Sequence, residues 1–273
     1  MSSPSIERLA RPYLFFVMVG AGFLVVASLL HVLLPVPLGL TFAELIVLGG
    51  LTLLYTSAMR EEARWPSLRP PRVAWWSWPL LVVLGVVLGL LANVLAALLV
   101  SVVPGWDELA RQYTEQVKRL LEQGAPWQQV AATLSVVIVA PLTEELAFRR
   151  GVLGLQRVSG EPARVSMWTN GALFALLHMN RLTFAPLLLL GAALARLTMW
   201  SRSVWPAILV HATVNLTNGV LIPRLVGEAA DLQAQTIPTA QALGGVLVLG
   251  GLALALMRAL RDPLQRDATD RDE

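Results

Sequence analysis

Apolar residues form long runs along the chain, and short polar or charged segments separate one run from the next. A helix needs about 20 mostly apolar residues to cross a bilayer, and roughly eight runs reach or approach this length. These runs are Tyr13–Leu34, Thr41–Met59, Pro79–Val103, a charged stretch within Val130–Leu155, Val165–Met179, Thr183–Trp200, Ser203–Ile222 and Ala240–Met257. The pattern predicts an all-α, polytopic membrane bundle of about eight transmembrane helices, in a single integral membrane domain over residues 1–273.

The segment Gly105–Pro126, between the third and fourth runs, has a different pattern. Apolar residues recur there at helical spacing with charged residues between them, at Trp106, Leu109, Tyr113, Val117, Leu120 and Leu121. This spacing predicts an amphipathic helix. Two placements are open for it: the helix lies on the outer membrane surface, or it is a connector that packs on its own bundle.

The composition agrees with a membrane protein and excludes some catalytic mechanisms and kinds of metal site. The chain is 56% hydrophobic and 14% charged, whereas soluble chains carry about 25% charged residues. It contains no cysteine, which excludes thiol proteases and cysteine-ligated metal sites. The formal net charge of +3 does not indicate nucleic acid as a partner, because basic residues in a membrane chain mainly set its orientation.

The distribution of the basic residues predicts that orientation. With the N-terminus inside, fourteen basic residues fall in inner segments and five in outer segments. Because positive charge accumulates on the cytoplasmic side, we expect a multi-pass protein of the cell (plasma) membrane with both termini in the cytoplasm. Membrane lipids are its expected surroundings.

Ionisable residues inside the runs are few, and each is a functional candidate because burying charge in a membrane is costly. The carboxylates and histidines of the runs are Glu44, Glu144, Glu145, His31, His178 and His211. Every aspartate falls outside the runs, which excludes an aspartyl protease. The chain shows neither a Gly-x-Ser-Gly element on a run nor a His-Glu-x-x-His motif. Glu44 and His31 lie near the outer ends of their runs, and we interpret both as interfacial.

The fourth run carries two adjacent glutamates, Glu144 and Glu145, followed by Arg149. Neighbouring residues on a helix point about 100° apart, so the two carboxylates cannot share one face. Glu145 and Arg149 have the i,i+4 spacing of an ion pair. Glu144 is therefore left without a partner on its own helix and is free for chemistry.

Two later helices each carry a pair of residues on one face. Phe174 and His178 are four residues apart, and so are His211 and Asn215, a spacing that aligns side chains on a helix. A buried polar group without a partner costs several kcal/mol in hydrocarbon. We therefore expect both histidines, Asn215 and Glu144 to converge on one site.

Together, Glu144-Glu145-x-x-x-Arg149, Phe174-x-x-x-His178 and His211-x-x-x-Asn215 form an ordered set. The set resembles the signature EExxxR, FxxxH, HxxxN/D of the CPBP family. These intramembrane proteases include the Rce1-type CAAX prenyl endopeptidases and bacteriocin-processing or Abi proteins. The resemblance covers about Ala140–Asn218, departs from the signature at no motif residue, and implies a catalytic core over residues 128–222.

The resemblance implies an endopeptidase that uses an activated water. Glu144, aided by His178, would take a proton from water and return it to the leaving amide. His211 and Asn215 would hold the developing oxyanion.

Supporting roles and the cofactor also follow from the resemblance. Glu145 and Arg149 would fix the fourth helix, and Phe174 would pack beside His178. Whether a metal takes part is open. Glu144, His178 and His211 would supply three ligands to Zn²⁺ if a metal is used, and the same residues suit a metal-free mechanism.

The implied substrate is a membrane-anchored or lipidated peptide or protein, of the CAAX type or a bacteriocin or pheromone precursor. One alternative is a catalytically silent scaffold or immunity protein built on the same fold. A proton-coupled transporter is less favoured, because the sequence shows no inverted repeat.

Overall fold

The structure is a computed structural model that describes residues 6–59, 65–122, 124–226 and 238–269. Within these ranges the regular elements are helices, and four of them, labelled η, have the wider turns of a π-helix. Of the fourteen basic residues that the sequence places in inner segments, five have side chains outside the described part: Arg8, Arg60, Arg64, Arg266 and Arg271.

The chain order alternates long helices with short π-helical segments. The elements are α1 (Ile6–Leu33), α2 (Val36–Ala43), η1 (Glu44–Leu51), α3 (Thr52–Ser57), α4 (Ser77–Val102), α5 (Trp106–Glu122), α6 (Pro126–Leu134), η3 (Ser135–Val139), α7 (Ala140–Glu145), η4 (Leu146–Leu153), α8 (Gly154–Val158), α9 (Ala163–Leu177), α10 (Arg181–Ser201), α11 (Trp205–Leu216), η5 (Thr217–Leu221), α12 (Ile222–Val226) and α13 (Thr239–Thr269). The all-helical membrane bundle expected from the sequence is confirmed.

In the described part of the chain, seven helical stretches are long and apolar enough to cross a membrane, one fewer than predicted. The difference is α9, predicted as the span Val165–Met179. Its 15 residues extend about 22 Å at 1.5 Å per residue, less than the ~30 Å hydrocarbon core. The last span also differs, because within α13 it extends to Gln265 and so includes Asp262, which the sequence placed outside the runs.

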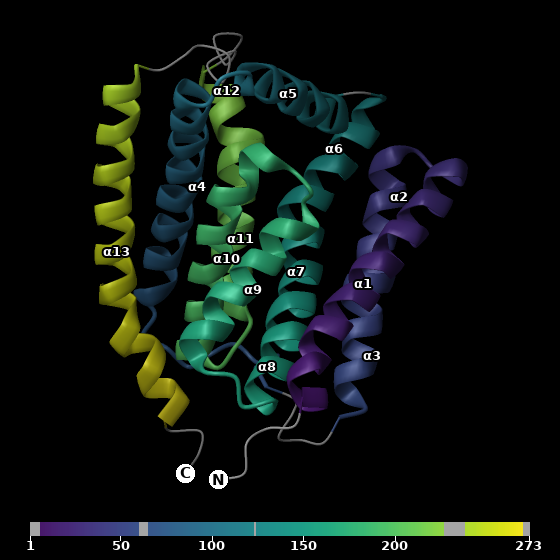
Figure 1. Ribbon diagram of the computed structural model, residues 1–273, viewed down its shortest axis with the longest axis vertical. Helices are drawn as coiled ribbons and strands as arrows, with labels where there is room; N and C mark the ends of the chain where they lie inside the picture. The colour runs from purple at the N-terminus through teal and green to yellow at the C-terminus, as the bar shows by residue number, and fades with distance from the viewer. Residues whose placement is uncertain (1–5, 60–64, 123, 227–237, 270–273) are drawn as a thin grey trace.

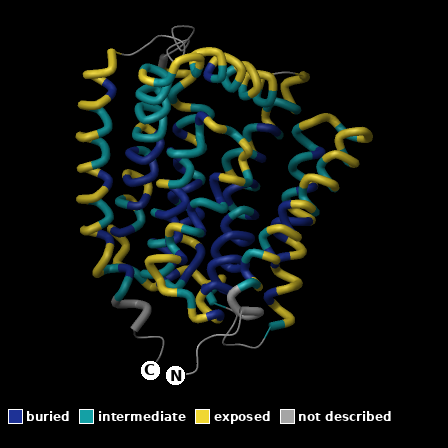
Figure 2. Tube along the Cα trace, in the orientation of Figure 1, coloured by how far each residue is buried: buried dark blue, intermediate teal, exposed yellow. Residues whose placement is uncertain are grey.

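The central helices are α4, α7, α10 and α11, with the α1–α2–α3 segment on one side and α13 on the other (Figure 1). Burial follows this order, because half of the α10 span is buried but only 11% of the α13 span (Figure 2). α1 begins and α13 ends at the same end of the bundle (Figure 1). This agrees with two termini on one side; that this side is cytoplasmic stays a prediction.

α5 lies across the opposite end of the bundle, roughly at right angles to the long helices (Figure 1). It contacts α4, α6 and α10, and Ala110 is buried in this packing. On its exposed face, hydrogen bonds from Arg111 lower the pKa of the Glu108 carboxyl. The amphipathic helix is therefore present and packs on its own bundle; its position relative to the membrane surface stays a prediction.

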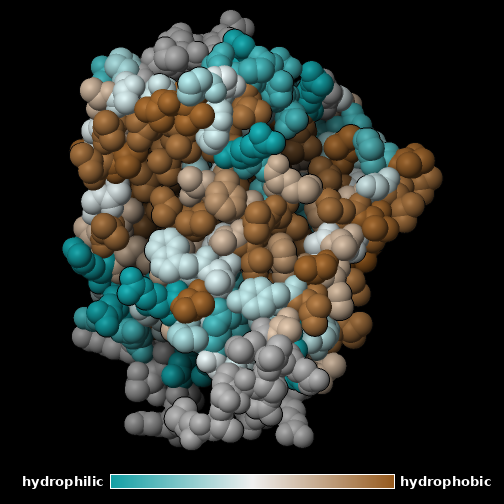
Figure 3. Space-filling model, viewed as in Figure 1, coloured by the Kyte–Doolittle hydropathy of each residue, from teal (hydrophilic) through white to brown (hydrophobic). Residues whose placement is uncertain are grey.

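The surface has the polarity expected of a membrane protein. In Figure 3 an apolar band covers the middle of the visible face, and hydrophilic residues gather toward both ends. The hydrophilic cover at one end includes α5, whose exposed charges form ion pairs such as Arg119–Glu115 at 3.2 Å. Two polar ends around an apolar band are the arrangement that a bilayer requires.

Glycines allow α4 to approach α11 closely. A Cβ atom at Gly85 would lie 2.5 Å from Thr213 Cβ and 2.9 Å from the Val210 carbonyl oxygen. One turn further, a Cβ atom at Gly89 would lie 3.0 Å from Asn218 Oδ1. The Gly-x-x-x-Gly spacing thus marks a tight helix contact, as small residues do in membrane bundles, and this contact seats the helix that carries His211.

We expect Gly85→Val to lower the thermal unfolding temperature of the detergent-solubilised protein, because the new side chain would force α4 away from α11. Overpacking of this kind costs about 1–3 kcal/mol. The matched control is Gly244→Val in α13, where a Cβ atom would have nothing within 4 Å. An equal change of the unfolding temperature in the two variants would contradict the close contact. It would mean that the change comes only from replacing a glycine within a helix.

Candidate active site

Glu145 and Arg149 form a fully buried ion pair at the junction of α7 and η4. Arg149 Nε donates to Glu145 Oε2 over 2.6 Å, and both side chains are 0% exposed. The i,i+4 pair expected from the sequence is therefore present. An arginine removed from water to this degree needs several hydrogen-bond acceptors, because its desolvation is costly.

His211 of α11 lies between the two adjacent glutamates. Its Nδ1 is 3.0 Å from Glu145 Oε1, and its Nε2 is 3.9 Å from Glu144 Oε2. Because the carboxylate of Glu145 accepts the hydrogen bond, Nδ1 donates and Nε2 is the nitrogen that faces Glu144. The two glutamates point apart on their helix, as expected, yet they reach opposite nitrogens of the same imidazole.

Glu144 is held near His211 without a direct hydrogen bond to it. The 3.9 Å separation exceeds the length of a hydrogen bond. Glu144 Oε2 is a buried oxygen with no hydrogen-bond partner among the described residues. A buried acceptor that lacks a partner marks a place where a ligand or reactant fits.

Asn170 of α9 completes the coordination of Arg149. Arg149 Nη1 donates to Asn170 Oδ1, and Asn170 Nδ2 donates to the carbonyl oxygen of Phe148 over 3.0 Å. Asn170 is 0% exposed. Asn170 is not one of the motif residues, although it lies four positions before Phe174 and therefore on the same face of α9. That spacing was the signal available.

The ring of Phe174 packs against the imidazoles of both His178 and His211. Its ring centroid is 4.9 Å from that of His178 and 5.5 Å from that of His211. The packing beside His178 agrees with expectation, and the contact with His211 is additional. His178 itself is exposed, and its Nδ1 donates to the Phe174 carbonyl oxygen over 2.9 Å. Among the described residues, no hydrogen bond or ion pair joins His178 to Glu144.

The end of α9 explains the position of His178. Met179 adopts a left-handed backbone conformation with φ 47, which is uncommon for a residue with a side chain and occurs at functional sites. Asn180 then caps α10 by accepting hydrogen bonds from the backbone of Leu182 and Thr183. The chain therefore reverses at His178 after a short helix and presents this histidine at the turn.

Asn215 lies one turn beyond His211 and binds the neighbouring helix. Its Nδ2 donates to the carbonyl oxygen of Val136 over 2.8 Å. Val136 belongs to η3, where the wide π-helical turn changes the backbone pairing, and such turns are frequent at functional sites. One of the two amide hydrogens of Asn215 is thus used to hold α11 against η3.

Glu44 belongs to the surroundings of Glu144, which differs from our interpretation of it as interfacial. α2 packs on η3, where Thr41 donates to Ser135 over 2.7 Å. η1 packs on α7, where a Cβ atom at Gly49 would lie 3.2 Å from Thr143 Cγ2. Glu44 Oε2 is buried, has no partner in the described part of the chain, and interacts electrostatically with Glu144. Hydropathy gives the position of a residue along a span but not the helix that it faces.

The zinc hypothesis can be tested against the donor set. Zinc ligands lie about 2.0–2.2 Å from the metal, so they must converge on one point. Within the described ranges, no three histidine, aspartate or glutamate side chains are grouped to hold a metal ion. Because these three side chains are not grouped in this way, Glu144, His178 and His211 do not fit a zinc site in this arrangement.

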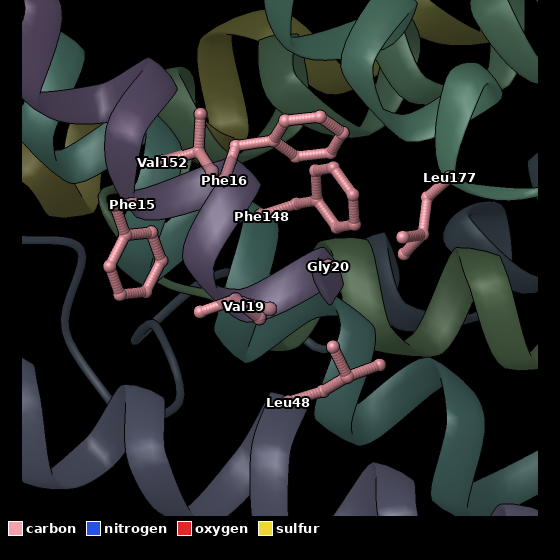
Figure 4. Close-up of a pocket in the computed structure, with 9 residues that line it drawn as sticks. Phe15, Phe16, Val19, Gly20, Leu48, Phe148, Val152 and Leu177 are labelled. Atoms are coloured by element: carbon pink, nitrogen blue, oxygen red, sulfur yellow. The ribbon is translucent and has the colours of Figure 1, made fainter. Parts of the chain in front are cut away.

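A small apolar cavity lies behind the site (Figure 4). It has room for about 10 Å³ and is lined by residues of α1, η1, η4 and α9: Phe15, Phe16, Val19, Gly20, Leu48, Ala147, Phe148, Val152 and Leu177. Phe148 forms the wall between this cavity and Phe174, with the two ring centroids 5.2 Å apart. A space of this size holds about one water molecule, so it is not a substrate pocket.

The fold and the site define a class: a multi-pass helical membrane protein with a buried glutamate, histidine and arginine site on its central helices. Residues 126–217 match the family described as type II CAAX prenyl endopeptidase Rce1-like. The match covers about a third of the chain, and all seven motif residues lie within it. The comparisons with curated proteins and with solved structures gave no match.

We expect Arg149→Met to destabilise the protein by about 3–5 kcal/mol, because it leaves Glu145 buried without its cation. Unfolding of the detergent-solubilised protein measures the loss. Arg111→Met removes an exposed ion pair of α5 and should leave the stability nearly unchanged, because exposed ion pairs contribute little. The double variant Glu145→Gln with Arg149→Met should recover part of the loss. Equal effects of Arg149→Met and Arg111→Met would show that the buried pair is not as described.

Proposed function

We propose that this protein is an intramembrane endopeptidase in which Glu144 activates a water molecule. The observation that carries the proposal is the buried, unpartnered Glu144 Oε2 that faces His211 Nε2 across 3.9 Å. A carboxylate with a free oxygen beside an imidazole is the combination that general base catalysis uses. The family match supports proteolysis as the reaction. The catalytic segment is residues 128–222.

In the proposed reaction the water oxygen attacks the carbonyl carbon of the scissile peptide bond while Glu144 takes the proton from water. The tetrahedral intermediate then collapses, the C–N bond breaks, and Glu144 returns the proton to the leaving nitrogen. His178, at the turn after α9, assists Glu144. The burial around Glu144 limits competing water, which strengthens each electrostatic interaction in the site.

His211 and Asn215 stabilise the oxyanion in this proposal. Glu145 binds Nδ1 of His211, so Nε2 is directed to the site and, in the protonated imidazole, donates to the developing negative charge. Asn215 has one amide hydrogen bonded to Val136, and its second donates to the same oxyanion. The ion pair of Glu145 with Arg149 holds this arrangement in place.

We assign the reaction to the glutamate type, in which no metal is obligatory. The donor set supports this assignment, because Glu144, His178 and His211 do not converge on one point. Were Zn²⁺ bound after a rearrangement of His178, these residues would hold it, and the metal would polarise the water and the scissile carbonyl.

The proposed substrate is a membrane-anchored or lipidated peptide, either of the CAAX type that the family description names or a bacteriocin or pheromone precursor. The proposed location is the cell membrane, with both termini in the cytoplasm. A lipid anchor would keep such a substrate at the membrane and raise its local concentration near the buried site.

Glu144→Ala should reduce cleavage of membrane-anchored peptides by at least about a hundredfold, since general base catalysis contributes 10²–10⁴. Purified protein in detergent or liposomes is offered a library of such peptides, and mass spectrometry detects the products. Glu115→Ala, on the exposed face of α5, is the matched control and should retain full activity. Cleavage by wild type and Glu144→Ala alike, or by neither, would remove the proteolytic proposal and favour the silent scaffold or the transporter.

Chelation should leave the cleavage rate unchanged within about twofold, because the proposed mechanism routes no step through a metal. The measurement is product formation before and after incubation with 1,10-phenanthroline, with a non-chelating isomer as control. A rate that falls with the chelator and returns with added Zn²⁺ would assign the site to the metalloprotease type, with metal-bound water in place of free water.

A further inference from the structure

A chain of hydrogen bonds leads away from the site through residues that the motifs do not include. Asn170 Nδ2 donates to Gln156 Oε1 over 3.5 Å, and Gln156 Nε2 donates to Thr169 Oγ1 over 2.7 Å. Thr169 Oγ1 lies 3.2 Å from Glu161 Oε1, to which the Tyr13 hydroxyl also donates over 3.2 Å. These contacts join α9, α8, the turn between them and α1.

The inner members of this chain are buried in the bundle. Gln156 and Asn170 are both 0% exposed, whereas Thr169, Glu161 and Tyr13 are partly exposed at the edge. Burying an amide is unfavourable unless it is hydrogen-bonded. Here the amide groups of Gln156 and Asn170 have partners on both sides, so the network is satisfied and rigid rather than adaptable.

In the direction of the active site, the network ends at the imidazole of His211, which the proposed reaction uses. Asn170 accepts from Arg149, Arg149 donates to Glu145, and Glu145 binds His211 Nδ1. Each link restricts the rotation of the next side chain, because guanidinium and amide groups are planar and their hydrogen bonds are directional. The orientation of His211 therefore depends on where Asn170 and Gln156 hold Arg149.

We propose that Asn170 and Gln156 are positioning residues: acting through Arg149 and Glu145 they fix the orientation of His211, and through Glu161 they tie that orientation to Tyr13 of α1. The proposal deepens the proposed function and rests on it for its kinetic consequence only. It gives α1, which lies outside the matched segment 126–217, a part in the geometry of the site.

The orientation of His211 can be measured without any enzymatic assay. The chain has three histidines, so ¹⁵N-histidine labelling gives three ring systems, and His211→Gln assigns one of them. Asn170→Leu should shift and broaden the His211 ring signals, whereas His31 should not change. Asn170→Asp keeps an acceptor oxygen for Arg149 but loses the Nδ2 donor to Gln156 and Phe148, so it should restore the wild-type His211 signal only in part.

Gln156→Met and Tyr13→Phe extend the test to the far part of the network. Gln156→Met preserves the side-chain length but removes both hydrogen bonds, and it should shift His211 in the same direction as Asn170→Leu. Tyr13→Phe removes the hydroxyl bonded to Glu161 and should give a smaller shift of the same sign. An unchanged His211 signal in Tyr13→Phe would overturn the link to α1.

Kinetics then separates positioning from substrate binding. Asn170→Leu should lower kcat by about ten- to a hundredfold, the effect typical of residues that orient a functional group through another. KM should stay within about twofold, because Asn170 is fully buried and has no access to substrate. Asn170→Asp, which keeps the acceptor for Arg149 but not the donor to Gln156, should recover part of kcat.

The control is Asn93→Leu, which removes a hydrogen bond of 2.8 Å to Asn218 between α4 and η5. It should lower the unfolding temperature without moving His211 or kcat. If Asn170→Leu behaves like Asn93→Leu, the role of Asn170 is structural and the proposal is overturned. If His211 moves as expected but the wild type cleaves no peptide, positioning stands and only the proposed function fails.

Discussion

The burial of one positive charge organises this protein. Arg149 is 0% exposed in the middle of a membrane bundle, where an uncompensated guanidinium would cost several kcal/mol. Its partners come from two helices, Glu145 on its own segment and Asn170 on α9. Glu145 also binds His211 of α11. The hydrogen bonds that stabilise the buried Arg149 therefore connect its own helix with α9 and α11. The geometry around Glu144 is a consequence of this connection.

Local patterns in the sequence predicted the features that depend on residues close together in the chain, namely the spanning helices and the contacts within one helix. The runs of apolar residues located the spanning helices to within about five residues, except for the end of the last one, since hydrophobic length is a property of each segment alone. The pair of Glu145 with Arg149 was predictable for the same reason, because i,i+4 spacing fixes proximity on one helix. The contact of Phe174 with His178 follows the same rule.

Contacts between helices far apart in the sequence could not be predicted in this way. Nothing in the local pattern shows that Glu44 faces Glu144, or that Asn170 rather than another polar residue binds Arg149. These contacts depend on which helices are neighbours and in what register. The register of the α2–η1–α3 segment along η3, α7 and η4 includes the hydrogen bonds of Thr41 with Ser135 and of Arg150 with Thr56, in each of which the partners are 94 positions apart. α9 was predicted as a full span, and this was wrong because hydropathy does not distinguish a full span from a partial one.

The π-helical turns have a consequence for how such a site can change. Segment η4 carries Arg149, η3 supplies the carbonyl that Asn215 binds, and η1 begins at Glu44. A π-helical turn holds about one residue more than an α-helical turn. Removing that residue would restore an ordinary α-helical turn and leave the helix on either side nearly in register, but it would change the direction of the side chains within the turn. Chain length within these turns, as much as residue identity, therefore decides where Arg149 and the Val136 carbonyl point.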